Sequence, residues 1–125
     1  MPGLRGMPQK TRREFGNLGE DYAAKLLKSK GYQVISRNFR TKFGEIDIVA
    51  IHEGTLVFVE VKTRWSKRFG NPEEAVTPAK LRRIKKAAEY FSLTHNLLPK
   101  KLAIEVVAIE VEEGRVTSAR IIQTY

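Results

Sequence analysis

The chain has 125 residues, which is long enough for one domain with a hydrophobic core, and it contains no cysteine and only two histidines. These counts exclude a disulfide framework, a thiolate zinc site and an all-histidine metal site, so any metal chemistry would rely on oxygen ligands. The net charge of +9, from 23 Lys and Arg against 14 Asp and Glu, favours a polyanionic partner. Charge alone does not distinguish DNA from RNA or from an anionic membrane surface.

The sequence has neither a signal-peptide core nor an apolar run long enough to cross a bilayer, so we expect a cytoplasmic protein that does not enter a membrane. Residues 1–10 contain glycines and prolines without helical or strand periodicity, and we expect them to form a flexible basic arm. Residues 11–125 are expected to form a single domain.

A first helix is predicted over residues 12–30, where apolar residues recur at helical spacing. Thr11 and Glu14 fit a capping box at its start. An equally good capping pattern from Asn17 to Glu20 would start the helix later, and it would make Glu20 a capping residue with no chemical role. The sequence leaves both starts open.

Apolar and polar residues alternate from Tyr32 to Phe39, which predicts the first strand, and residues 40–44 predict a turn after it. Two apolar runs then flank Glu53-Gly54, a plausible two-residue hairpin turn.

Ionisable residues interrupt the two apolar runs of this hairpin. Counting outward from the turn places Asp47 opposite Glu60. Two residues further from the turn, Glu45 lies opposite Lys62. Because side chains alternate along a strand, all four lie on one face of the hairpin, at the end away from the turn.

Opposed side chains in an antiparallel pair lie only about 4.5–5.5 Å apart at Cβ, so Asp47 and Glu60 would repel each other. Both strands are apolar on both faces, as in covered strands, and solvent would screen this repulsion weakly. We expect Lys62 and a divalent cation to offset it, with the main-chain carbonyl of Val61 or water completing the metal shell.

Such a cation would hold a phosphate and lower the pKa of a bound water, while Lys62 would orient that water or stabilise the phosphorane charge. The predicted chemistry is therefore phosphodiester hydrolysis. The alternative interpretation is a pair of exposed strand ends joined by a salt bridge between Glu45 and Lys62.

Basic residues on both sides of the hairpin are candidates for contacts with nucleic acid. They are Arg37, Arg40 and Lys42 before it, and Arg64, Lys67 and Arg68 after it. Trp65 would stack on an exposed base or, as is more common for a lone Trp in a loop, would pack on its own domain.

A second helix is predicted to begin with the cap Thr77 and the first-turn Pro78, and to run to about Thr94. Its polar positions concentrate basic residues: Lys80, Arg82, Arg83, Lys85 and Lys86. They either follow phosphates along a groove, with Lys80 and Arg83 as contacts, or form an ordinary solvated helix face.

Two last strands are predicted over residues 101–110 and 115–123, with a turn at Glu113-Gly114. The predicted order is therefore a helix, three strands, a helix and two strands. This order indicates an α/β fold in which helices flank a mixed sheet.

The hairpin motifs resemble a known group of nucleases. Glu45-Ile46-Asp47 followed by Glu60-Val61-Lys62 is similar to the PD-(D/E)XK nuclease superfamily, whose restriction-endonuclease-like fold includes archaeal Holliday junction resolvases. Within it, segments between residues 17 and 109 are similar to the bacterial YraN family. These segments are Gly19-Glu20-Asp21, Gly31-Tyr32, Arg37-Asn38, Gly44-Glu45-Ile46-Asp47, Phe58-Val59-Glu60-Val61-Lys62-Thr63-Arg64 and Pro72-Glu73-Glu74-Ala75-Val76.

The resemblance implies catalytic positions at Asp47, Glu60 and Lys62, and it matches Glu20 to an acid that junction resolvases carry on their first helix. It also implies DNA more than RNA as the substrate, and a homodimer by analogy with enzymes that act on two-fold symmetric junctions. This chain departs from the family pattern where Glu105 replaces the usual Asp, and where Leu81 replaces the Gln that many members carry.

We therefore predict an endonuclease that depends on Mg²⁺, with Mn²⁺ also suited to the oxygen ligands, and that acts on DNA, with branched or damaged DNA as candidate substrates. Asp47, Glu60 and Val61 would hold the metal, and Glu20 and Glu45 would complete or tune the site. The rival hypotheses are a nucleic-acid binding module of this architecture without efficient catalysis and, less favoured, an adaptor whose basic surface meets an acidic protein.

Overall fold

The computed structural model of the protein describes the backbone of residues 9–64, 77–95 and 98–124, and within these ranges the side chains from Leu18 onward. The helices and strands are α1 (Gln9–Ser29), β1 (Gln33–Thr41), β2 (Gly44–His52), β3 (Thr55–Arg64), α2 (Pro78–Thr94), β4 (Lys101–Glu112) and β5 (Arg115–Gln123). Their order is the predicted one. None of the described helices is both long and apolar enough to span a membrane.

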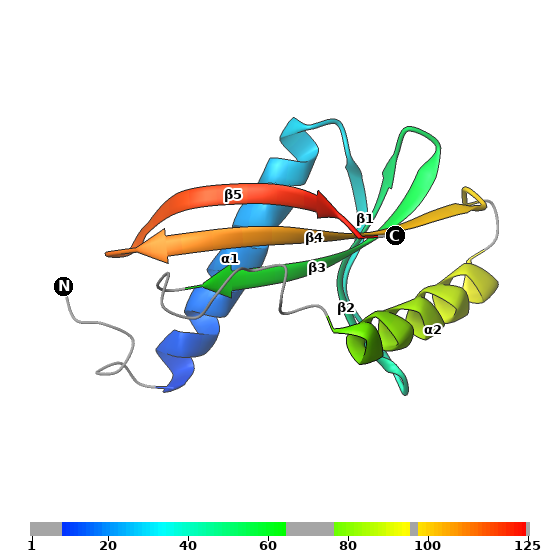
Figure 1. Cartoon of the computed structure of the whole chain (residues 1–125), viewed down its shortest axis with the longest axis horizontal. Coiled ribbons are helices and arrows are strands. Elements are labelled where there is room, and N and C mark those ends of the chain that lie inside the picture. Colours follow the sequence, from blue (N-terminus) through cyan, green and yellow to red (C-terminus); the bar gives the residue numbers. More distant parts are fainter. Residues whose placement is uncertain (1–8, 65–76, 96–97, 125) are drawn as a thin grey trace.

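The five strands form one mixed sheet in which neighbours along the chain are also neighbours in space, from β1 to β5 (Figure 1). Adjacent strands are antiparallel except β3 and β4, which run parallel. Parallel neighbours need a long crossover, and α2 lies in the connection between them. The predicted α/β class is confirmed, and the architecture is consistent with a restriction-endonuclease-like fold.

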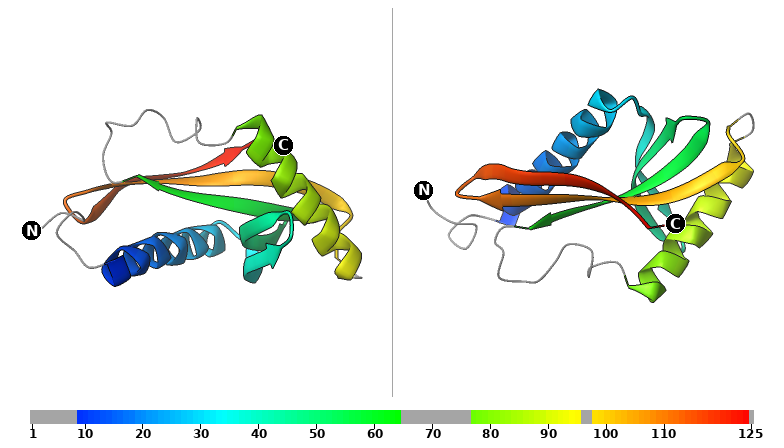
Figure 2. Two further views of the ribbon diagram at one scale, coloured as in Figure 1. Left: turned by 90° about the horizontal axis from the view of Figure 1, so that it is seen from below. Right: turned by 45° about the horizontal axis from the view of Figure 1, so that its top comes forward.

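The two helices pack on opposite faces of the sheet (Figure 2), which explains why β2 and β3 are apolar on both faces. On one face, Leu27 of α1 is fully buried against residues of β2, β3 and β4. On the other face, Phe91 of α2 meets Phe58 of β3 edge to face, with ring centroids 5.9 Å apart. This double covering leaves little water around a charge placed between the two helices, as at Asp47 or Glu60, whereas Glu45 near the start of β2 stays exposed.

The start of α1 differs from both predicted starts. The helix already includes Gln9 and Lys10, so neither Thr11 nor Asn17 caps it, and the interpretation of Glu20 as a capping residue is wrong. Gln and Lys are good helix formers, which favours extension beyond the capping pattern. The remainder of the predicted arm, residues 1–8, lies outside the described residues.

The hairpin turns match the sequence pattern. Glu53 and Gly54 have φ values of 49° and 71°, the left-handed pair of a type I′ turn, and Glu113 and Gly114 repeat it with 52° and 75°. The turn before β2 is tighter than predicted because β1 extends to Thr41, whose Oγ1 accepts a hydrogen bond from the Phe43 N–H at 3.0 Å.

Helix α2 begins as predicted. Thr77 is its N-cap, and the Oγ1 atom of this residue accepts a hydrogen bond from the Lys80 N–H at 3.1 Å. Lys80 therefore lies in the first turn of the helix.

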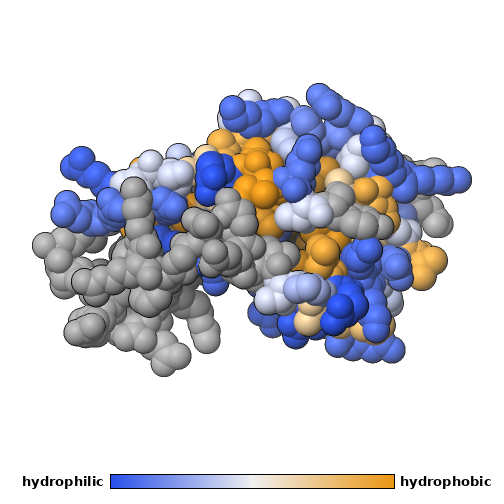
Figure 3. Space-filling model, viewed as in Figure 1, coloured by the Kyte–Doolittle hydropathy of each residue, from blue (hydrophilic) through white to orange (hydrophobic). Residues whose placement is uncertain are grey.

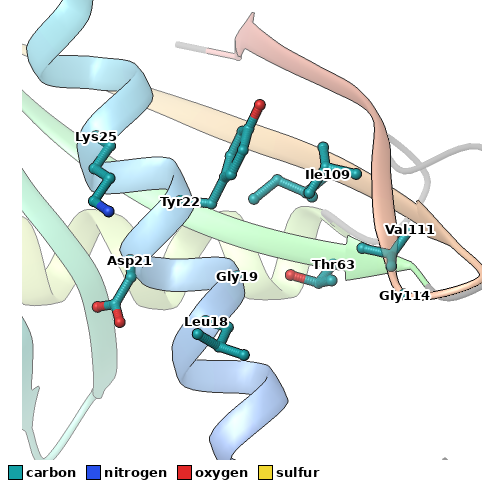
Figure 4. A pocket seen from close by; sticks show the side chains of 10 residues that line it. Leu18, Gly19, Asp21, Tyr22, Lys25, Thr63, Ile109, Val111 and Gly114 are labelled. Carbon is teal, nitrogen blue, oxygen red and sulfur yellow. The ribbon is translucent and has the colours of Figure 1, made fainter.

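A close approach between α1 and β3 brings the next helical residue toward the hairpin. A Cβ atom at Gly19 would overlap Oγ1 of Thr63, so the missing side chain lets the helix lie against the strand. Figure 4 shows Gly19 facing Thr63, with Tyr22 directed toward β4 and Asp21 directed away from β3, where it pairs with Arg37 of β1. This contact holds Glu20 close to the end of the hairpin that carries the acidic residues.

Candidate active site

The β2–β3 hairpin has the predicted register near its turn, but the predicted pairs of Asp47 with Glu60 and of Glu45 with Lys62 are not part of the ladder. His52 pairs with Thr55, and the ladder continues to Ile48 opposite Val59. The ladder ends at this pair, although β2 begins at Gly44 and β3 continues to Arg64. We call the part of the hairpin beyond this pair, where β2 and β3 no longer pair with each other, the open end.

A side chain replaces the ladder at the open end. The Val61 N–H donates a hydrogen bond of 2.7 Å to Oδ2 of Asp47. In a strand the N–H and C=O groups of one residue point to the same side, so the Val61 carbonyl also faces β2. The predicted metal ligand at Val61 is therefore directed toward the carboxylate with which it would share a cation.

The open end collects acidic groups from three elements around Asp47. Burial raises the pKa of Asp47 to about 7, and the negative charges of Glu60, Glu20 and Glu45 add to this rise. The hydrogen bond from Val61 acts in the opposite direction. The acids predicted from sequence thus influence one another electrostatically, with Glu20 coming from α1, Glu45 and Asp47 from β2, and Glu60 from β3.

Each acid around Asp47 has a basic partner on another element. The pairs are Glu20 Oε1 with Arg37 Nε at 3.4 Å, Glu45 Oε2 with Arg40 Nε at 3.3 Å, and Glu60 Oε1 with Lys80 Nζ at 2.5 Å. Glu45 lies opposite Arg40 in the β1–β2 ladder, which continues where the β2–β3 ladder has ended. The alternative interpretation, a salt bridge between Glu45 and Lys62, is therefore wrong.

Lys62 lies half-buried on β3, two residues after Glu60, so the two residues share a strand face. The ion pairs of the described residues do not include it. Lys62 was expected to offset the repulsion between Asp47 and Glu60, but in the structure Lys80 is the residue that pairs with Glu60. Its amine remains available for another role.

The open end fits a hard divalent cation in its donor chemistry. Asp47 is a buried carboxylate that accepts a hydrogen bond from the Val61 N–H and forms no ion pair among the described residues, Glu60 lies near enough to raise its pKa, and the Val61 carbonyl faces β2. Within the described ranges, however, no three Asp, Glu or His side chains converge closely enough to form a ready metal cluster. Ion pairing explains this spread, because the partners of Glu20, Glu45 and Glu60 lie on other elements.

Comparison with known proteins gives the family of the chain. The model of the family described as "Uncharacterised protein family UPF0102" matches residues 19–111, a range that contains Glu20, the whole hairpin and α2. The chain belongs to this family.

Relatives from several bacteria carry the same family name. A UPF0102 protein of Syntrophomonas wolfei is 47% identical over 114 residues, which cover 90% of this chain and 98% of the relative. Another, from Caldicellulosiruptor saccharolyticus, is 55% identical over 80 residues, 64% of this chain and 68% of the relative. One from Moorella thermoacetica is 40% identical over 114 residues, 90% and 95% of the two chains. These names state no activity, so membership of the nuclease superfamily stays a prediction.

The basic residues predicted to contact nucleic acid have different surroundings in this UPF0102 member. Arg37 binds Asp21 at 2.7 Å as well as Glu20, so its guanidinium ties β1 to α1. Arg40 is 82% exposed although it pairs with Glu45, and Arg64 is half-buried at the end of β3. Trp65, Lys67 and Arg68 lie outside the described residues.

The outward surface of α2 carries the remaining candidates, and it is largely hydrophilic in Figure 3. Arg82, Arg83 and Lys86 are exposed, whereas Lys80 turns toward Glu60. A hollow lined by Glu45, Lys80 and Arg83 joins this surface to the open end. The acidic and basic features predicted separately are thus adjacent.

Two contacts were not foreseen from the sequence. Lys80 was predicted as a phosphate contact, but its place in the first turn of α2 brings its amine to Glu60 of β3. Glu105 is 4% exposed and accepts a hydrogen bond of 2.7 Å from the Tyr32 hydroxyl, while the Tyr32 ring stacks on His52 with centroids 3.8 Å apart. Glu105 therefore acts as an anchor between β4 and the start of β1.

Proposed function

We propose that this protein is a metal-dependent endonuclease that hydrolyses phosphodiester bonds in DNA. The observation that supports the proposal is the Asp47 carboxylate, which is buried beside Glu60 where the β2–β3 ladder opens and whose pKa is raised to about 7. Two neighbouring acids at a covered position destabilise the fold, so their presence there points to a chemical role.

In this proposal Asp47, Glu60 and the carbonyl of Val61 hold the metal, with Glu20 and Glu45 near enough to influence its charge. Mg²⁺, or Mn²⁺ in its place, would supply positive charge and a bound water of lowered pKa. The chain's own part is to present oxygen ligands in a poorly solvated position, where their affinity for a hard cation is high.

Lysine 62 would act on the reacting phosphate. Its position on the same strand face as Glu60 brings an amine to the open end, where it would orient the attacking water or stabilise negative charge on the phosphate. Metal binding would also require Glu60 to share or release Lys80, and the released amine could then meet a phosphate oxygen.

A specific observation favours a second candidate, a nucleic-acid binding module without efficient catalysis. The pairs of Glu60 with Lys80 and of Glu45 with Arg40 already neutralise two of the acids. If these pairs persist when nucleic acid binds, the open end is a structural ion network below a basic surface.

The test compares wild type with Asp47→Asn, Lys62→Ala and the matched control Asp21→Asn, whose carboxylate is half-exposed and paired with Arg37. Labelled single strands, duplexes, flaps and four-way junctions would be incubated with Mg²⁺, Mn²⁺ or a chelator. We expect metal-dependent cleavage by wild type and the control, and a loss of about 100-fold or more in both site variants.

Equal cleavage by wild type and Asp47→Asn would refute the site. Binding that survives Asp47→Asn, with no cleavage of any substrate under any metal condition, would favour the binding module. Binding to an acidic protein that does not depend on salt would favour an adaptor.

A further inference from the structure

Three neighbouring hollows lie beside the outer surface of α2, and one of them reaches the open end. The hollow next to the acids contains Lys80, Arg83 and Phe43. Phe43 also lines a second hollow, which reaches Arg40, Lys42 and Tyr90, and Arg83 lines a third, with Arg82 and Lys86. We call these three hollows together the α2 groove.

Phe43 brings two ammonium groups together in this groove. Nζ of Lys42 lies 5.2 Å from the centroid of its ring, and Nζ of Lys86, which comes from α2, lies 5.9 Å from it. Cation–π contacts of this kind restrict long side chains that would otherwise be free in solvent. The turn before β2 and the middle of α2 therefore present two positive charges at one place.

An exposed aromatic ring lies next to these charges. Tyr90 is 46% exposed, and its inner side is supported by Phe39, with ring centroids 6.3 Å apart. Because Lys86 and Tyr90 are four residues apart on a helix, their side chains lie on the same face. A cation and a supported ring in succession suit a phosphate and the base that follows it.

We propose that the α2 groove binds a single-stranded segment of DNA, with phosphates on Arg83, Lys42 and Lys86 and a base stacked on Tyr90. An exposed ring contributes to binding only when the face of a base is free, which is the case in a single strand but not inside a duplex. This inference rests on the proposed function for the choice of DNA and for the path of the strand past the acids, since Glu45 lines the hollow that shares a residue with each of the other two.

The test measures binding without cleavage. Fluorescence anisotropy of a labelled single strand, and of a duplex of the same sequence, would be recorded in a chelator with wild type, Tyr90→Ala and Tyr90→Phe. The matched control is Tyr22→Ala, because Tyr22 is similarly exposed, at 42%, but lies on α1. Thermal unfolding would establish that each variant is folded.

We expect Tyr90→Ala to weaken single-strand binding by about 10-fold, with Tyr90→Phe close to wild type and Tyr22→Ala unchanged. Replacing Lys42 and Lys86 together by Ala should lower the slope of log affinity against log salt by about 1.4, as expected for two lost phosphate contacts.

Equal single-strand affinity for Tyr90→Ala and wild type, or equal losses for single strand and duplex, would overturn the inference. Because these measurements exclude metal, they are independent of cleavage. Binding in the α2 groove without any cleavage would refute the proposed nuclease activity but support the groove. Cleavage with no effect of Tyr90→Ala on single-strand binding would support the nuclease activity but refute the groove.

Discussion

The paired part and the open end of the β2–β3 hairpin are built from the same two strands but differ in their side chains and in their hydrogen bonding. From its type I′ turn the hairpin forms a regular ladder, and residues in the middle of this ladder, such as Val49 and Phe58, are buried and apolar. At the open end the ladder stops, a carboxylate takes a backbone N–H, and acids gather under poor solvation. Apolar packing is concentrated in the paired part of the hairpin, and groups suited to chemistry are concentrated in the open end.

The largest expected effect is on the paired, apolar part of the hairpin. Phe58→Ala removes a fully buried ring that packs on Phe91, so we expect the free energy of unfolding to fall by about 3–5 kcal/mol in urea denaturation. Leu93→Ala is the control, because Leu93 is 81% exposed on the same helix as Phe91 and should change stability by less than about 0.5 kcal/mol. A loss below about 1 kcal/mol for Phe58→Ala would mean that this core contributes little.

A smaller effect should appear at the open end as a dependence of stability on pH. The pKa of Asp47 is raised to about 7 in the folded protein, above its ordinary value near 4, so its stabilising contribution is complete at low pH and is lost as pH rises through 7. We expect wild type to lose on the order of 1–3 kcal/mol relative to Asp47→Asn between pH 4 and pH 8.

Urea denaturation of both proteins across this pH range would measure the difference. Mg²⁺ at pH 8 should restore stability to wild type but not to Asp47→Asn, since only the carboxylate attracts the cation. Parallel curves for the two proteins would mean that Asp47 ionises as it does in the unfolded chain.

The smallest expected effects are changes of stability at the Glu53-Gly54 turn. Gly54→Ala places a Cβ at a φ of 71°, which should cost about 1 kcal/mol, whereas Glu53→Asn should stabilise the protein by a few tenths of a kcal/mol, because Asn adopts a φ near 49° more readily than Glu. Thermal unfolding would show opposite shifts of the midpoint. Shifts of the same sign would contradict the assigned role of the turn.

Local patterns in the sequence predicted most of the fold. The Glu-Gly turns, the Thr77 cap and the strand from about Tyr32 each follow from patterns of a few residues, and the structure confirms them. The start of α1 was not predicted, because capping preferences of this size are outweighed by the helix propensity of preceding residues.

The candidate site was only partly predictable. Alternation and register identified the acids of the hairpin, because both are properties of neighbouring strands. The ion partners were not predictable in the same way. Lys80 reaches Glu60 through the crossover, and Tyr32 meets Glu105 from the other half of the chain, so both contacts depend on the assembled sheet.

The single parallel seam between β3 and β4 has a consequence for how the molecule assembles. On either side of it the strands β1–β3 and β4–β5 are linked by short turns and can form from local encounters. Joining the two units requires the intervening chain with α2 to close a long loop. The entropic cost of this closure comes before the stabilisation from pairing β3 with β4. The acids of the hairpin all lie in the β1–β3 unit, so their mutual repulsion does not depend on whether β4 and β5 have joined the sheet.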